Sequence, residues 1–158
     1  MQLETKKSAD FARVAVALRT TIEGFKTDSA TIVALWGDLG AGKTTLTQYL
    51  AKSFGIEDDV VSPTFVIMKI YDLENENTSH LARGHHAEGF ASLVHIDAYR
   101  FENPKEASGI RLHELIANPK NLIVIEWPEL LGDRLPEHRI DVKIEHDGDG
   151  RKISIDKV

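Results

Sequence analysis

Cysteine is absent from this sequence of 158 residues. The chain therefore has no disulfide framework, no thiolate metal site and no cysteine nucleophile. Apolar runs of the ~20 residues that a membrane span requires are also missing, and residues 1–7 lack the apolar core of a signal peptide. A surplus of basic charge is missing as well, because the formal net charge is −6. We therefore expect a cytoplasmic protein that does not enter membranes and does not grip nucleic acid alone, since such binding depends mainly on neutralising phosphates.

The composition is that of a folded globular protein. Hydrophobic residues make up 42% of the chain and charged residues 28%, which are ordinary globular values. The length suits one domain that can bury a core of its own. Residues 1–158 are therefore predicted to form a single domain.

Short apolar runs predict the strands of this domain. Three runs rich in β-branched residues have the continuous hydrophobicity of strands buried on both faces, namely 31–36, 93–97 and 122–126. A further strand is predicted over 60–71, interrupted early by Pro63, which cannot donate to a ladder. Residues 140–145 and 152–156 alternate in hydrophobicity around a glycine-rich turn, which predicts a terminal β-hairpin.

Helical periodicity fills the intervals between these strands. Ser8 is predicted to cap a helix that stops near Gly24, and its apolar stripe is Phe11, Val14, Ala15, Leu18 and Ile22. A second helix is predicted at 44–54, a helix start at Asn103, and a short amphipathic helix around 110–116. Alternating strands and helices predict an α/β fold, with a central, mostly parallel sheet flanked by helices and a C-terminal antiparallel hairpin.

A glycine-rich loop joins the first buried strand to the second helix. Its residues are Gly37, Asp38, Leu39, Gly40, Ala41, Gly42, Lys43, Thr44 and Thr45. Triphosphate oxygens need several converging N–H donors, and a side chain at Gly40 or Gly42 would obstruct their approach. The helix N-terminus adds free N–H groups, Lys43 reaches the β- and γ-phosphates, and the Thr44 hydroxyl binds Mg²⁺. The loop therefore predicts a P-loop NTPase fold with ATP or ADP and Mg²⁺ as cofactors. The alternative is a glycine-rich turn without a binding function.

Two acidic residues end buried strands, where a phosphate loop needs a carboxylate near its magnesium. Asp97 ends the strand 93–97 and Glu126 ends the strand 122–126. One can hold Mg²⁺ through its water shell while the other contacts the metal or orients the attacking water. The alternative for each residue alone is a cap or a salt-bridge partner. We therefore predict catalytic and metal-binding roles for both, without assigning which one contacts the metal.

Other polar residues around these motifs leave alternatives open. Ser62 to Phe65 lies where a loop could cover the γ-phosphate, and a hydroxyl such as that of Thr64 could sense it; the alternative is a β-edge turn. His95 shares a strand face with Asp97, which could fix its tautomer, although a satisfied core histidine is equally compatible. Arg100 could face phosphate, a partner carboxylate or Glu102. His80, His85 and His86 fit a solvated loop better than a metal site.

The ordered set of motifs resembles the TsaE family, formerly called YjeE, over about residues 5 to 145. The matching segments are Gly-Asp-Leu-Gly-Ala-Gly-Lys-Thr-Thr (37–45), Ser-Pro-Thr-Phe (62–65), His-Ile-Asp-Ala-Tyr-Arg (95–100) and Glu-Trp-Pro-Glu (126–129). The resemblance implies a weak ATPase that works with TsaB and TsaD in threonylcarbamoylation of adenosine after the anticodon, in tRNAs that read codons beginning with A. It implies tRNA contact only through that complex.

The resemblance also implies roles for individual residues. Lys43 and Thr44 match the phosphate and metal residues, Asp97 the Walker B-like acid, and Glu126 a metal or catalytic residue. Residues 62–65 match a switch-like segment, and Asp10 is the nearest match to an acidic residue that lies near the nucleotide. The polar stretch 74–89 is longer than the hairpin that is usual in the family, so its histidines inherit no role.

Two other functions remain compatible with a phosphate loop. A P-loop kinase for a small molecule would need an arginine-bearing lid, and the arginines after Arg100 are few. A nucleotide-binding regulator without turnover would not need both acids. No Asn-Lys-x-Asp motif for guanine is present, which favours adenine.

Overall fold

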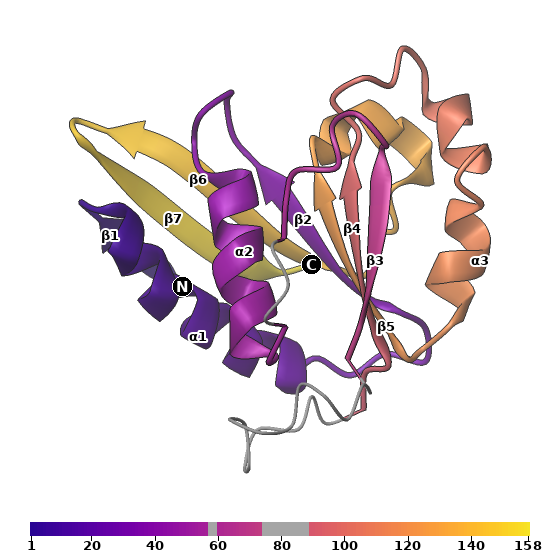
Figure 1. Cartoon of the computed structure of the whole chain (residues 1–158), viewed down its shortest axis with the longest axis horizontal. Helices are drawn as coiled ribbons and strands as arrows, with labels where there is room; N and C mark the ends of the chain where they lie inside the picture. Colours follow the sequence, from indigo (N-terminus) through magenta and orange to yellow (C-terminus); the bar gives the residue numbers. More distant parts are fainter. Residues whose placement is uncertain (57–59, 74–88) are drawn as a thin grey trace.

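The computed structural model describes residues 1–56, 60–73 and 89–158. Within them one mixed sheet has the strand order β1-β7-β6-β2-β5-β4-β3 (Figure 1). The strands are β1 (Gln2–Thr5), β2 (Thr31–Trp36), β3 (Met68–Asp72), β4 (Ser92–Asp97), β5 (Asn121–Glu126), β6 (Ile140–Asp147) and β7 (Gly150–Lys157). Strands β6, β2, β5 and β4 are parallel to one another, and antiparallel pairs flank them on both sides.

The centre of the sheet coincides with the three apolar runs of the sequence. Strands β2, β4 and β5 are buried along nearly their whole length, as parallel strands covered on both faces must be. The terminal hairpin is formed by β6 and β7. The predicted α/β class, the mostly parallel centre and the C-terminal hairpin are therefore confirmed.

Helices cover both faces of the sheet (Figure 1). They are α1 (Phe11–Glu23), α2 (Lys43–Ser53) and α3 (Leu112–Ala117), with 3-10 segments η1 (Ser8–Asp10), η3 (Pro104–Ser108) and η4 (Pro128–Arg134). The first two helices share one core with Val33 and Val124, whereas α3, η3 and η4 share the other with Ile32 and Ile123. Side chains alternate along each strand, which divides the apolar runs between the two cores.

The strand register brings the predicted acidic residues together. Strands β4 and β5 are parallel neighbours, and Asp97 is paired with Glu126 at their carboxyl ends. Strand β2 is the other neighbour of β5, so the glycine loop that follows Trp36 emerges at the same edge. In open α/β sheets this edge is where ligands bind.

The start of the first helix differs from the sequence prediction. The predicted apolar stripe is buried, but Ser8 does not cap α1, because residues 8–10 form η1 instead. The capping carboxylate is that of Asp10, which accepts the backbone N–H groups of Lys6 and Lys7 at 2.8 and 2.9 Å. Asn103 does cap its helix, since its side chain accepts the N–H of Lys105 at 3.1 Å.

The edges of the sheet also depart from expectation. The predicted strand 60–71 is shortened to β3, because the carbonyl of Pro63 accepts the N–H groups of Val66 and Ile67 in a turn. Strand β1 was not predicted, and it pairs antiparallel with β7. The predicted polar excursion at 74–89 lies outside the described residues up to position 88, and so do His80, His85 and His86.

Candidate functional site

The glycine loop between β2 and α2 contains three left-handed glycines. Gly37, Gly40 and Gly42 have φ values of 146°, 77° and 110°, which side chains disfavour. A Cβ added at Gly40 would meet nothing within 4 Å, so the loop is open there. A Cβ at Gly42 would instead lie 2.7 Å from Cζ of Phe11. The positive φ of Gly42 agrees with the prediction, and the structure adds a reason that the sequence did not show: this glycine also makes room for Phe11 of α1.

Lys43 is held inside the loop by backbone oxygens. Its Nζ donates to the carbonyls of Gly37 at 2.5 Å and Asp38 at 2.9 Å. The ammonium also lies 3.8 Å from the ring centroid of Trp127, which adds a cation–π attraction. Burial lowers the pKa of Lys43 from its ordinary value, and nearby carboxylates, Glu126 foremost, oppose this shift. The ammonium is thus held inside the glycine loop by its own backbone and by Trp127.

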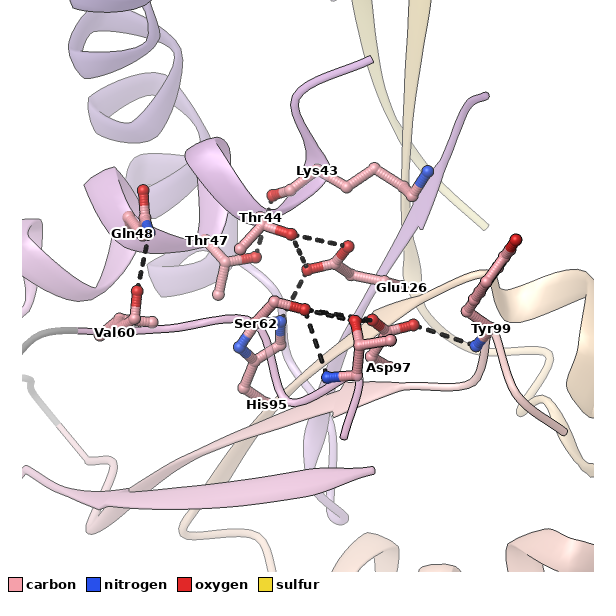
Figure 2. Close-up of polar contacts among 11 residues, drawn as sticks. Lys43, Thr44, Thr47, Gln48, Val60, Ser62, His95, Asp97, Tyr99 and Glu126 are labelled. Atoms are coloured by element: carbon pink, nitrogen blue, oxygen red, sulfur yellow. Dashed lines mark hydrogen bonds and ion pairs between the residues drawn. The ribbon is translucent and has the colours of Figure 1, made fainter. Parts of the chain in front are cut away.

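Thr44 and Glu126 form a hydrogen-bonded pair between the loop and the sheet. The Thr44 hydroxyl lies 2.9 Å from Oε1 and 3.1 Å from Oε2 of Glu126 (Figure 2). Glu126 is 3% exposed and also contacts His95, whose Nε2 lies 2.8 Å from Oε1. A threonine of a phosphate loop and a strand-end carboxylate therefore converge on one point, as ligands of one hard cation would.

Asp97 has a different set of partners. Its Oδ1 accepts the backbone N–H of Tyr99 at 3.0 Å, and its Oδ2 accepts a hydroxyl hydrogen bond from Ser62 at 3.3 Å (Figure 2). Oδ2 also accepts a hydroxyl hydrogen bond from Thr64. The two hydroxyls are 2.5 Å apart. Asp97 therefore ties the segment 60–67 to the end of β4. The suggested pair of His95 with Asp97 is not formed, because His95 bonds to Glu126 instead.

Two cavities meet at the glycine loop. The first, of about 330 Å³, is lined by Leu39, Gly40, Gly42, Lys43, Thr44, Thr45, Ser62, Thr64, Asp97, Tyr99, Glu126 and Trp127. The second, of about 220 Å³, is lined by Thr5, Lys6, Lys7, Ser8, Phe11, Gly40, Ala41, Gly42, Thr45, Asp149, Gly150 and Arg151. Thr45 and two glycines line both. The two cavities therefore adjoin at the loop: Asp97 and Glu126 line the first, and Lys6, Lys7 and Arg151 line the second together with Asp149.

Most of the predicted site residues border these cavities. Gly37 and Asp38 line neither of the two and contribute the carbonyls that hold Lys43. Asp10 also lies outside both linings. Hydrogen bonds from the backbone of Lys6 and Lys7 lower the pKa of its carboxyl, which is thus engaged in the turn before α1.

The sequence analysis missed the basic side of the second cavity. The Arg151 guanidinium donates to the carbonyls of Ala41 at 3.1 Å, Gly40 at 3.2 Å and Gly150 at 2.8 Å. It therefore clamps the glycine loop to the turn of the β6–β7 hairpin. The sequence signal was limited to a glycine-rich turn followed by a cation, and only the fold brings that turn beside the loop.

Aromatic side chains border the first cavity. The Trp127 ring contacts Lys43 and lies 5.1 Å from the ring of Tyr99, centroid to centroid, so it does more than fill the core. The Arg100 guanidinium lies 5.4 Å from the ring of Phe65, which is 88% exposed. Arg100 thus contacts the segment 60–67, an arrangement outside the three predicted alternatives.

Comparison with known proteins identifies related chains. The family model described as threonylcarbamoyl adenosine biosynthesis protein TsaE matches residues 5–153. The tRNA threonylcarbamoyladenosine biosynthesis protein TsaE of Bacillus subtilis is 33% identical over 77% of this chain and 65% of its own length. The corresponding protein of Haemophilus influenzae is 32% identical over 82% of this chain and 72% of its own.

A solved structure agrees with these sequence matches. The crystal structure of Bacillus subtilis YdiB superposes with a TM-score of 0.69 at 25% identity. The superposition covers 98% of this chain and 83% of that one. In the part of this chain that the structure describes, no helix has the length and apolar character needed to cross a membrane.

Proposed function

The chain belongs to the TsaE family of tRNA threonylcarbamoyladenosine biosynthesis proteins, and from this premise we propose that it is a Mg²⁺-dependent ATPase of that pathway. The observation that carries the proposal is the Thr44–Glu126 hydrogen bond beside a phosphate loop with Lys43 in place. Hydrolysis is weak in the isolated protein and is stimulated by its partners.

The loop fits the phosphates of ATP. Gly40 faces open space at its Cβ position, so no side chain there would keep phosphate oxygens from the backbone N–H groups with which a nest binds anions. Lys43 needs only to exchange its bonds to two carbonyls for bonds to phosphate. The pre-positioned ammonium and the N-terminus of α2 would together hold the β- and γ-phosphates.

The residues around Thr44 also fit Mg²⁺. No group of three or more histidine and carboxylate side chains in the described parts forms an all-protein metal site. Mg²⁺ in nucleotide sites is held instead by one or two protein oxygens, phosphates and waters, and Thr44 and Glu126 would supply the protein oxygens. When bound, the ion would neutralise charge on the transferring phosphoryl group.

Asp97 would act through the segment 60–67. Its carboxylate binds the hydroxyls of Ser62 and Thr64, both of which line the cavity with Glu126. A hydroxyl held there could meet the γ-phosphate and order the segment when ATP is present. Glu126 is thus the direct metal candidate, and Asp97 positions the segment that closes over the phosphates.

The second cavity suits the nucleoside end of ATP. It begins at Thr45, in the first turn of α2, where the α-phosphate of a loop-bound nucleotide would lie. Lys6, Lys7 and Arg151 line it together with Asp149, and the three cations favour the α-phosphate, from which the ribose and base would extend into the cavity. We assign adenine as the base because the guanine-reading motif is missing from the sequence.

The partners would be TsaB and TsaD, which place the threonylcarbamoyl group on tRNA. A net charge of −6 supports contact with tRNA through the complex instead of directly, since direct binding depends on neutralising phosphates. ATP hydrolysis by this chain would reset the complex between turnovers. ATP hydrolysis at the phosphate loop would then control when the complex starts a new turnover, and it would not modify a small substrate.

Phosphate release tests the proposal. Purified protein is mixed with ATP and Mg²⁺, with and without TsaB and TsaD, and free phosphate is measured. The expected result is slow release that rises when both partners are present. Partner-independent transfer of phosphate to a small molecule would identify a kinase instead, and ATP binding without any release would identify a regulator.

A further inference from the structure

A buried histidine contacts the carboxylate that the proposed function places at the metal. His95 is fully buried on β4, two positions before Asp97. Its Nε2 lies 2.8 Å from Oε1 of Glu126 (Figure 2). Its Cα partner on β5 is Val124, so the contact is a diagonal one between neighbouring strands, which side chains of this length can span.

The ring nitrogens of His95 have unequal surroundings. Nδ1 is buried and has no hydrogen-bond partner in the described chain, whereas Nε2 faces a carboxylate. An unpaired buried N–H would leave its desolvation uncompensated, and a lone pair on Nε2 would face the lone pairs of Oε1. We therefore assign the proton to Nε2, so that His95 donates and Oε1 of Glu126 accepts.

The hydrogen bond from His95 fixes the last side-chain torsion of Glu126, which is otherwise free to rotate. The terminal torsion of a glutamate is broad and roughly two-fold, so an unrestrained carboxylate would rotate about its last bond. Oε1 of Glu126 accepts from Nε2 of His95 on one side and from Thr44 on the other. The carboxylate plane is thereby set with Oε2 also facing Thr44, 3.1 Å from its hydroxyl.

We propose that His95 is a positioning residue, which holds Glu126 by a hydrogen bond from Nε2 so that the carboxylate faces Thr44 and the phosphate loop. The inference rests on the proposed ATPase function and adds a residue to it. His95 touches no reacting atom itself. Partners that orient a metal-binding carboxylate typically change metal affinity or activity by about 10- to 100-fold when they are removed.

Two matched amide variants separate positioning from core packing. The amide nitrogen of His95→Gln is as many bonds from Cα as Nε2 is, so it can reach Glu126; the shorter amide of His95→Asn cannot. Both variants bury one amide at the same place. In the partner-stimulated assay, we expect His95→Gln to keep most of the wild-type kcat and His95→Asn to lose about 10- to 100-fold. ATP affinity should change less than threefold in both, since Lys43 is untouched.

Equal kcat values for the two variants would overturn the proposal, as would a loss confined to KM. The tautomer gives a readout that needs no hydrolysis. In ¹⁵N spectra of the wild-type protein, the His95 ring, identified by its loss in His95→Gln, should show a protonated Nε2 and an unprotonated Nδ1. The Nε2–H proton should shift upfield in Glu126→Gln, because a charged acceptor becomes neutral.

These readouts distinguish the failure of the inference from that of the proposed function. A protein that releases no phosphate even with TsaB and TsaD contradicts the ATPase. A proton on Nδ1 of His95, or an Nε2–H signal that Glu126→Gln leaves in place, contradicts the positioning bond whether or not ATP is hydrolysed. The loss of the ring signal in either His95→Gln or His95→Asn identifies it, and the tautomer is then read from the wild-type protein, so the inference stays testable if one of the two variants does not fold.

Discussion

Gly40 and Gly42 of the phosphate loop should respond differently to substitution by alanine. Gly40 and Gly42 both have positive φ values, of 77° and 110°. A methyl group at Gly40 meets nothing within 4 Å, whereas one at Gly42 comes within 2.7 Å of Cζ of Phe11. We predict that Gly42→Ala mainly destabilises the fold and that Gly40→Ala mainly weakens ATP binding.

The expected loss in the free energy of unfolding is the sum of two separate contributions. A left-handed backbone costs an ordinary residue about 1–2 kcal/mol, and this cost applies to both substitutions. Overpacking of a filled site adds about 1–3 kcal/mol, and it applies only to Gly42→Ala because only its Cβ meets Phe11. The free energy of unfolding should therefore fall by about 2–5 kcal/mol for Gly42→Ala and by about 1–2 kcal/mol for Gly40→Ala.

Thermal unfolding and calorimetry with ATP measure the two effects. For a chain of this size each kcal/mol lowers Tm by about 2–4 °C. Gly42→Ala should therefore melt roughly 4–20 °C below the wild type, and Gly40→Ala roughly 2–8 °C below it. In the folded Gly40→Ala protein, ATP should bind at least about tenfold more weakly, because the methyl group occupies space that a phosphate needs.

A double-mutant cycle isolates the contact with Phe11. Phe11→Leu removes the ring atom that the new methyl group would meet, so Gly42→Ala should be less destabilising in that background. Contacting residues typically couple by about 0.5–3 kcal/mol. Identical melting temperatures for the two glycine variants, or no coupling between Gly42→Ala and Phe11→Leu, would refute the assignment of Gly42 to helix packing.

Three further predictions concern charged residues around the loop. Lys43→Ala should bind ATP at least about 100-fold more weakly by calorimetry, because a charge-assisted phosphate contact is lost; normal affinity would contradict the placement of the phosphates. Glu126→Gln should fold and bind ATP yet release phosphate at least about 100-fold more slowly, since its amide can still accept from His95 and donate to Thr44; unchanged release would remove Glu126 from the mechanism. Asp10→Asn should lower Tm at neutral pH relative to wild type, because Asp10 has a depressed pKa in the fold. That carboxyl stabilises the fold above its unfolded-state pKa and loses this effect as pH falls through its folded-state pKa. The difference between Asp10→Asn and wild type should therefore vanish in acid, and a gap that persists there would show that Asp10 acts otherwise.

The sheet and the loop could be predicted because local chemistry determines them. Parallel strands that are buried on both faces are continuously apolar, and the sequence has three such runs. The bounds predicted from these runs for β2, β4 and β5 are therefore nearly correct. The glycine loop could be predicted for a similar reason, because glycine adopts its positive φ values without the steric cost that other residues pay. The acids at the ends of β4 and β5 follow from the same strands, whose register then pairs Asp97 with Glu126.

The features that could not be predicted depend on distant contacts. His95 bonds to Glu126 because its side chain extends diagonally from β4 to the neighbouring strand β5. The spacing along β4 alone suggested Asp97 as its partner instead. Arg151 reaches the loop only because β7 folds back along β6 and β1 joins its far side. Gly42 is adjacent to Phe11 only after α1 packs on α2. None of these contacts leaves a local pattern.

The two strand-end acids are neighbours, yet they hold different parts of the site. Glu126 binds Thr44 and His95, while Asp97 binds the hydroxyls of Ser62 and Thr64. The backbone links them, because the N–H of Ala98 donates to the carbonyl of Glu126 at 3.1 Å and the N–H of Asp97 to that of Ile67 at 2.9 Å. Displacement of the segment 60–67 must therefore break its bonds to Asp97 or strain the strand end that abuts Glu126.

That coupling gives partner stimulation a physical route. Phe65 and Val66, at 88% and 59% exposure, are the most accessible apolar side chains of the segment, and a partner that covers them would gain apolar burial. Their neighbours Ser62 and Thr64 are fixed to Asp97, so a bound partner would hold those hydroxyls against the phosphate cavity. In the free protein the segment is held by these hydroxyl contacts and also at its two ends, where the Gln48 side chain donates to the carbonyl of Val60 at 2.8 Å and the N–H of Asp97 donates to the carbonyl of Ile67 at 2.9 Å. If the proposed ATPase is stimulated by its partners, a partner that contacts Phe65 and Val66 would act through this division of the two acids.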